Sequence, residues 1–185
     1  MIRSKDLALI IVFSVLTIVF MLLIGQVPEL VTGIPGISYV FTIVYSINQT
    51  VALLMFEGRR WRFFARGLLV TLLGFSFILT WNRPLGMATI VNAFIVDVVF
   101  NSVYGFFEQR NKLLWWAILS EVYHWSTHSL WIILFGSLFF YSFELIMETW
   151  FIPIMSMMLP IIIIEAIVGG YLGYQFYRRV KKVQN

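Results

Sequence analysis

The chain contains 185 residues, of which 61% are hydrophobic and only 12% are charged, with a formal net charge of +4 at pH 7. Soluble domains carry about 25% charged residues, so this composition indicates an integral membrane protein without a soluble module. The chain has no cysteine. That excludes a disulfide framework, a thiolate metal site and a thiol nucleophile.

Apolar runs separated by polar residues, glycine and proline predict an all-α bundle of six membrane-spanning helices. A span needs about 20 mainly apolar residues, so residues 1–185 form one integral domain with short connections. The first run follows Arg3 and Lys5 and lacks a small-x-small cleavage pattern, so we expect a retained span rather than a signal peptide. The predicted spans cover residues 7–25, 37–56, 64–81, 85–107, 113–141 and 150–177.

The basic residues predict that both termini are cytoplasmic, because Lys and Arg concentrate in cytoplasmic segments of membrane proteins. With the N-terminus inside the cell, Arg83 is the one of the 13 basic residues that falls in an outer loop. We therefore expect a multi-pass protein of the cell membrane whose positive charge requires no nucleic acid. The residues assigned to the cytoplasmic side are Arg3, Lys5, Arg59, Arg60, Arg62, Arg66, Arg110, Lys112, Arg178, Arg179, Lys181 and Lys182.

The first outer loop, Gly25 to Gly36, contains two prolines and three glycines but no basic residue. Such a loop fits a lid over a cavity, with Pro28, Glu29 and Pro35 as its candidate residues. An ordinary turn that keeps positive charge out of a translocated segment explains it equally well.

The cytoplasmic block GRRWRFFARG, Gly58 to Gly67, mixes arginine with tryptophan and phenylalanine. This mixture is found in proteins that stack on nucleic-acid bases, but an interfacial loop with an aromatic belt explains it better. Arg59, Arg60 and Arg62 are candidates for docking a membrane or cytoplasmic partner.

Ionisable and amide side chains lie within the predicted spans, where a charged group costs several kcal/mol and therefore faces a bundle interior, a cavity or a partner. In EVYHWSTH, Glu121, His124 and His128 follow a three-then-four spacing, so they share one stripe of a helix. Trp131 extends that stripe. The other polar residues inside the predicted spans are Asn48, Gln49, Asn92, Asp97, Asn101 and Glu165.

Three interpretations of these polar groups remain open. Glu121, His124 and His128 could hold one metal, although di-metal helical bundles use Glu-x-x-His on two helices and this chain has one copy. The groups could instead form interhelical hydrogen bonds alone. A pocket for a small molecule is favoured, because carboxylates, imidazoles and tryptophans together orient a compact polar ligand. No triad, phosphate loop or dinucleotide fingerprint is present, so we expect neither an enzyme nor a bound cofactor.

The order and spacing of the segments resemble the substrate-binding S component of energy-coupling factor (ECF) transporters, which import vitamins and related nutrients. The resemblance extends over nearly the whole chain. It is carried by RSKDLALIIVFSVLTIV, by PGISYVFTIVYSI after the first outer loop, by VDVVFNSVYGFFEQRNK and by PIIIIEAIVGGYLGYQFYRRVKK.

The resemblance implies a six-helix fold without ATPase activity, whose partners are a transmembrane coupling subunit and two ATPases. It also implies an outward-facing pocket covered by the segment from Pro28 to Pro35. Acidic and aromatic groups there favour a cationic heteroaromatic compound. The pocket would be lined by Asn92, Asp97, His124, His128, Trp131 and Glu165.

An accessory subunit of a larger membrane enzyme complex is the alternative function. In that case the helical bundle serves as a scaffold among other membrane subunits, with a possible metal site at Glu121, His124 and His128. A scaffold would fill the volume beneath the first outer loop with Trp131, Phe135 and Tyr141, whereas a transport subunit would keep it open.

Overall fold

The computed structural model describes residues 3–32, 41–78, 83–139 and 151–184, and every regular element in these ranges is helical. In the described ranges the elements form six continuous helical stretches that overlap the predicted spans, with the first and last running seven residues past the predicted ends. They are α1 (Ser4–Phe20) with η1 (Met21–Gln26) and α2 (Val27–Thr32), α3 (Thr42–Met55), α4 (Arg62–Phe77), α5 (Arg83–Ile95) with η3 (Val96–Phe100) and α6 (Asn101–Gln109), α7 (Leu113–Phe139), and α9 (Phe151–Gln184).

Three of these stretches are long and apolar enough to cross a membrane: Ser4–Thr32, Arg83–Gln109 and Met158–Lys182. The helix Thr42–Met55 is apolar but shorter than a full span. Length and composition are therefore compatible with a membrane protein, whereas six crossings remain a prediction.

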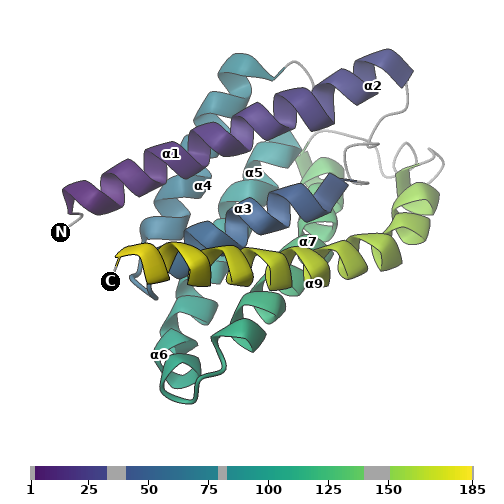
Figure 1. Ribbon diagram of the computed structural model, residues 1–185. Helices are drawn as coiled ribbons and strands as arrows, with labels where there is room; N and C mark the ends of the chain where they lie inside the picture. Colours follow the sequence, from purple (N-terminus) through teal and green to yellow (C-terminus); the bar gives the residue numbers. More distant parts are fainter. Residues whose placement is uncertain (1–2, 33–40, 79–82, 140–150, 185) are drawn as a thin grey trace.

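The contacts between the helices close into a ring, and Figure 1 shows one part of it, with α3 between α1 and α9. Around the ring, α1 contacts α3, α3 contacts α9, α9 contacts α7, α7 contacts α5, α5 contacts α4, and α4 returns to α1. Helices α3 and α7 also touch each other across the interior. Side chains that point inward from different helices therefore pack in the interior of the ring.

The contact between α3 and α9 depends on small residues. A Cβ atom on Gly169 would lie 2.4 Å from the Cβ of Ser46, and one on Gly173 would lie 2.6 Å from the Cβ of Thr50. Larger residues at either glycine would push the helices apart, because membrane helices approach closely only through small side chains. The glycines thus bring the α3 face that carries Ser46 and Thr50 directly against α9.

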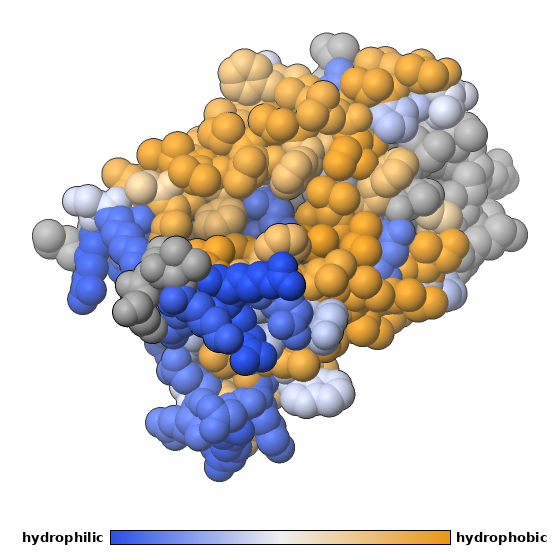
Figure 2. Space-filling view, in the orientation of Figure 1, coloured by the Kyte–Doolittle hydropathy of each residue, from blue (hydrophilic) through white to orange (hydrophobic). Residues whose placement is uncertain are grey.

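Helix α1 has one buried and one exposed stripe, as expected for a helix between a protein interior and lipid. Ile10, Ser14 and Thr17 are buried, whereas Leu7, Ile11, Val15 and Val19 are exposed. Hydrophilic residues gather at the end of the molecule that carries both termini, and apolar residues cover most of the rest of the visible face (Figure 2). This segregation agrees with the charge distribution predicted from the sequence.

The first predicted span differs from the structure at its C-terminal end. We expected the helix to end at Gly25 and a loop to follow, but the chain stays helical through η1 and α2 to Thr32. The wider π-helical turn of η1 ends at Gln26, two residues before Pro28, which has no N–H to donate to the preceding turn. Pro28 and Glu29 therefore belong to a helix rather than a loop, and Pro35 lies outside the described residues.

Candidate functional site: a buried polar cluster inside the helix ring

The interior of the ring contains buried polar side chains from three of its helices. We call the following set the central polar cluster: Ser46, Gln49 and Thr50 from α3, Arg66 from α4, and Glu121, His124, Trp125 and His128 from α7. Each of these residues has at least one buried polar atom with no hydrogen-bond partner among the described residues.

Arg66 lies one turn inside α4 and is buried. Its Nη2 atom donates a hydrogen bond of 2.7 Å to the Thr17 hydroxyl, which also accepts one of 2.8 Å from Nδ2 of Asn48. The guanidinium also lies 5.1 Å from the centre of the Phe63 ring. These contacts fix the cation inside the helix ring.

Glu121 is fully buried on α7 and faces the hydroxyls of Ser46 and Thr50, the indole of Trp125 and the charge of Arg66. Neither carboxylate oxygen forms a hydrogen bond of ordinary geometry within the described part of the chain. A buried carboxylate is costly unless it is paired and hydrogen-bonded. The three donors and the charge of Arg66 are the groups that the structure places around this carboxylate.

The two histidines are stacked, with ring centres 5.6 Å apart and an interplanar angle of 16°. The Thr89 hydroxyl donates to the carbonyl of Leu85 at 2.9 Å and lies 3.4 Å from Nε2 of His128. Because that hydroxyl proton is used, Nε2 of His128 is the protonated nitrogen in this contact. The Nδ1 atom of His128 is then an acceptor, and it has no donor among the described residues.

Asn92, a predicted ligand-binding residue, instead links α5 to α7. Its Nδ2 donates to the backbone carbonyl of His124 at 3.0 Å, and its Oδ1 accepts from the Thr127 hydroxyl at 2.9 Å. The amide is thus occupied on both sides. It holds α5 against the helix that carries Glu121 and the histidines.

Asp97 and Glu165, also predicted ligand-binding residues, cap helices. Asp97 accepts from the backbone N–H of Phe64 in the first turn of α4, and from Nδ2 of Asn101 at 2.6 Å. Glu165 accepts from the backbone N–H of Ile43 at 3.3 Å, in the first turn of α3. The first N–H groups of a helix have no partner within the helix, so carboxylates from neighbouring helices satisfy them here.

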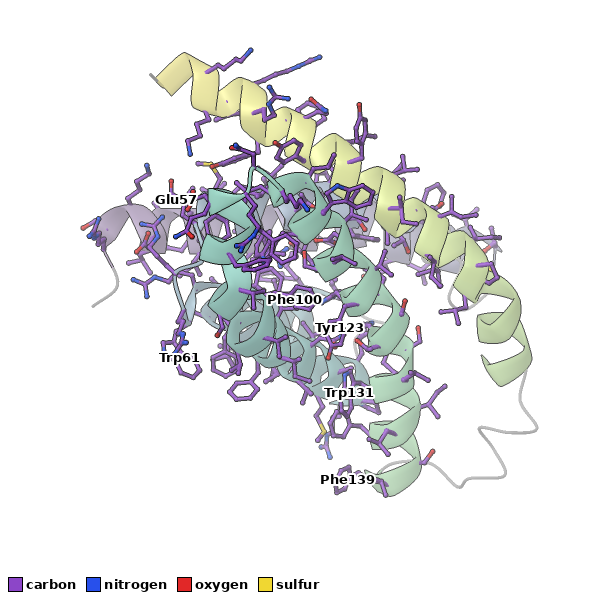
Figure 3. The ribbon with its side chains drawn as sticks, turned by 90° about the horizontal axis from the view of Figure 1, so that it is seen from below. Glu57, Trp61, Phe100, Tyr123, Trp131 and Phe139 are labelled. Carbon is purple, nitrogen blue, oxygen red and sulfur yellow. The ribbon has the colours of Figure 1, made fainter. Side chains whose placement is uncertain are left out.

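Trp131 lies beyond His128 on α7, between Tyr123 and Phe139 (Figure 3). Its ring stacks on Phe135 with a centre distance of 5.9 Å, and its indole nitrogen is buried without a partner among the described residues. Tyr141, which a scaffold subunit would pack beside these rings, lies outside the described residues.

All three predicted docking arginines form contacts within the chain. Arg59 pairs with Asp6 at 2.9 Å and Arg62 pairs with it at 3.1 Å. Arg60 is exposed and donates to the Ser102 hydroxyl at 3.3 Å. It borders a small cavity of about 90 Å³ with Trp61, Asp97, Val98 and Ser102.

The cluster does not form a metal site in the structure. Among the described residues, no three histidine or carboxylate side chains gather in an arrangement that could hold a metal ion. Glu121, His124 and His128 therefore share a helix face, as predicted, without assembling the metal site that their spacing suggested. The cluster brings polar side chains from three helices together, with Ser46, Thr50 and Trp125 directed at Glu121.

Comparisons with protein-family models, with curated proteins and with solved structures find no match to this chain.

Proposed function

We propose that this chain binds a small polar molecule inside the membrane and serves as the substrate-binding subunit of an ECF-type nutrient importer. The observation that carries the proposal is the convergence of unpaired buried polar atoms in the central polar cluster. Buried polar groups are nearly always hydrogen-bonded, so several unpaired groups at one place indicate an occupant that completes their bonds. Ordered water alone is the simplest competing occupant.

The arrangement around the cluster also favours a binding subunit. The ligand would meet fixed groups, because Arg66 is anchored to Thr17 and Asn92 holds α5 against α7. Preorganised polar groups at the centre of a mainly apolar site are typical of small-molecule binding. Both termini at one hydrophilic end of the molecule (Figures 1 and 2) agree with the predicted topology, in which they are cytoplasmic.

The proposal can be tested by purifying the full chain from its native membrane in mild detergent and identifying what accompanies it by mass spectrometry. We expect one small molecule per chain, together with a transmembrane coupling subunit and ATPases. Subunits of a large enzyme without a small molecule would instead establish the alternative role as a scaffold.

Variants connect the ligand to the cluster. Glu121→Gln and His128→Ala should each reduce ligand recovery about tenfold or more, since each removes an unpaired acceptor that the ligand completes. Glu57→Gln is the matched control, because this exposed carboxylate lies outside the cluster. Full recovery of the ligand from both cluster variants would place the binding site elsewhere.

A further inference from the structure

A cavity of about 90 Å³ lies between the turn that precedes α4 and the helical stretch of η3 and α6, and it is lined by Arg60, Trp61, Asp97, Val98 and Ser102. This volume holds several water molecules, but it is well below the roughly 300 to 1,000 Å³ of pockets that enclose a drug-sized ligand. Of the five lining residues, Asp97 is buried and the other four are exposed. The cavity is therefore a surface pocket with room for one compact group.

Arg60 supplies the positive charge of this cavity. Arg59 and Arg62 both pair with Asp6, whereas Arg60 forms no ion pair with any described residue. Within the described part of the chain, its guanidinium donates one hydrogen bond, of 3.3 Å, to the Ser102 hydroxyl. That hydroxyl donates in turn to a backbone carbonyl of η3. Ser102 thus orients the guanidinium, and its remaining N–H groups are available to an oxyanion.

The carboxylate of Asp97 forms the inner wall of the cavity but does not offer an open site for a cation. It is 1% exposed, and it already accepts hydrogen bonds from the backbone N–H of Phe64 and from Nδ2 of Asn101. A bound oxyanion would contact the exposed guanidinium of Arg60 directly. Two parallel hydrogen bonds from a guanidinium to one oxyanion are among the strongest polar contacts in proteins.

Exposed aromatic and apolar side chains border the cavity. Trp61 is 51% exposed, and its ring centre lies 6.2 Å from that of Phe94, which is 44% exposed. Val98, four residues after Phe94, is exposed as well. Figure 3 shows Trp61 on the side of the molecule where α1 begins and α9 ends. Tryptophan and arginine gather where a membrane protein passes from the hydrocarbon to the headgroups, so the cavity has the composition of a headgroup site.

We propose that this cavity binds the phosphate group of a membrane phospholipid at Arg60, while the acyl chains lie along the apolar surface that begins at Trp61, Phe94 and Val98. The cavity has room for a phosphate but not for the chains, which remain outside it. A soluble phosphate would use Arg60 alone, whereas a phospholipid also covers the exposed rings. This inference goes beyond the proposed function and does not depend on the central polar cluster.

The test uses three probes that separate the phosphate from the acyl chains: phosphatidylglycerol, diacylglycerol with the same chains, and glycerol 3-phosphate. Their binding to the purified full-length protein in mild detergent is measured at pH 7 by native mass spectrometry. We expect phosphatidylglycerol to bind about tenfold or more tightly than either of the other two, because it alone offers both parts.

Two arginine variants locate the phosphate. Arg60→Gln should lower the affinity for phosphatidylglycerol about tenfold, to that of diacylglycerol. Arg110→Gln is the matched control, because Arg110 is also exposed but stacks on Phe106 and does not line the cavity. It should leave the affinity unchanged. Since Arg60 is exposed and forms no ion pair with a described residue, its replacement should leave the thermal unfolding midpoint unchanged.

Three results would overturn the proposal. Diacylglycerol that binds as tightly as phosphatidylglycerol would show that the phosphate contributes nothing. An equal loss of affinity in both arginine variants would show that positive charge in general, rather than this cavity, attracts the lipid. Glycerol 3-phosphate that binds as tightly as the lipid, and is lost in Arg60→Gln, would assign the cavity to a soluble phosphate compound instead.

Discussion

Replacing Asp6 by asparagine should destabilise the whole protein, because this one carboxylate joins the start of α1 to both sides of the turn between α3 and α4. Asp6 is fully buried. Its Oδ1 pairs with Arg59 at 2.9 Å, and its Oδ2 accepts from Nε and Nη2 of Arg62 at 3.2 and 3.1 Å. Asparagine keeps the shape of the side chain but removes its charge.

The expected loss in the free energy of unfolding depends on how far the two arginine partners of Asp6 are exposed to water. Breaking a fully buried ion pair costs about 3 to 5 kcal/mol, but the side chains of Arg59 and Arg62 are 25% and 14% exposed, so water replaces part of the interaction. We therefore expect a loss of about 2 to 3 kcal/mol, which corresponds to a midpoint lower by about 4 to 12 °C for a chain of this size. Thermal unfolding in detergent, followed by circular dichroism, measures this shift.

Glu57→Gln provides the matched control, because Glu57 also pairs with Arg59 but at 3.4 Å and with a side chain that is 50% exposed. Exposed ion pairs contribute about 0 to 1 kcal/mol, so the midpoint should change little. An Asp6→Asn midpoint that is no lower than that of Glu57→Gln would refute the reasoning.

Three further substitutions probe packing and helix capping by the same thermal measurement. Gly173→Ala should lower the free energy of unfolding by about 1 to 3 kcal/mol, because the new methyl group meets α3. Gly105→Ala is the control: its methyl group would have nothing within 4 Å, so the change should be neutral or slightly stabilising. Equal unfolding midpoints for the two variants would argue against the close contact. Asp97→Ala should lower the free energy of unfolding by about 1 to 3 kcal/mol by removing the cap of α4, and ligand recovery should stay unchanged. A loss of ligand without a loss of stability would instead show that Asp97 belongs to the binding site. Glu165→Ala should cost about 0.5 to 2 kcal/mol by uncapping α3, and an unchanged midpoint would show that the cap contributes nothing.

The sequence predicts the positions of the helices well, because long apolar runs interrupted by polar residues leave few alternatives. It also predicts that the stripe of Glu121, His124 and His128 is buried, since the spacing of three and four residues places them on one face. These predictions need only local periodicity. The structure agrees with them in helix positions and in burial of the stripe.

Local periodicity does not predict contacts between segments that are far apart in the sequence. The carboxylate of Asp97 caps a helix 33 residues earlier in the chain, and that of Glu165 caps one 122 residues earlier. An acidic residue within a span looks the same in the sequence whether it binds a ligand or caps a neighbouring helix. Only the packing of the helices decides between these roles.

The burial of Arg66 inside the bundle was missed for a different reason. The charge rule assigns each arginine according to the nearest span boundary, and Arg66 follows closely after Arg59, Arg60 and Arg62. A signal was nevertheless available, because Arg62 and Arg66 are one turn apart and an almost uninterrupted apolar run follows. A helix that begins at Arg62 necessarily carries Arg66 into the bundle.

The helical turn from Arg62 to Arg66 connects the surface ion pair with Asp6 to the polar cluster in the interior. Arg62 is held at the surface by Asp6, and Arg66 reaches the interior about 6 Å farther along the same rigid rod. A partner that pulled the first residues of α1 would therefore transmit that pull along α4 to the guanidinium inside the ring. Conversely, a ligand bound to the guanidinium of Arg66 inside the ring would restrain α4. It would thereby restrain the ion pair between Arg62 and Asp6, at the end of the protein where both termini lie.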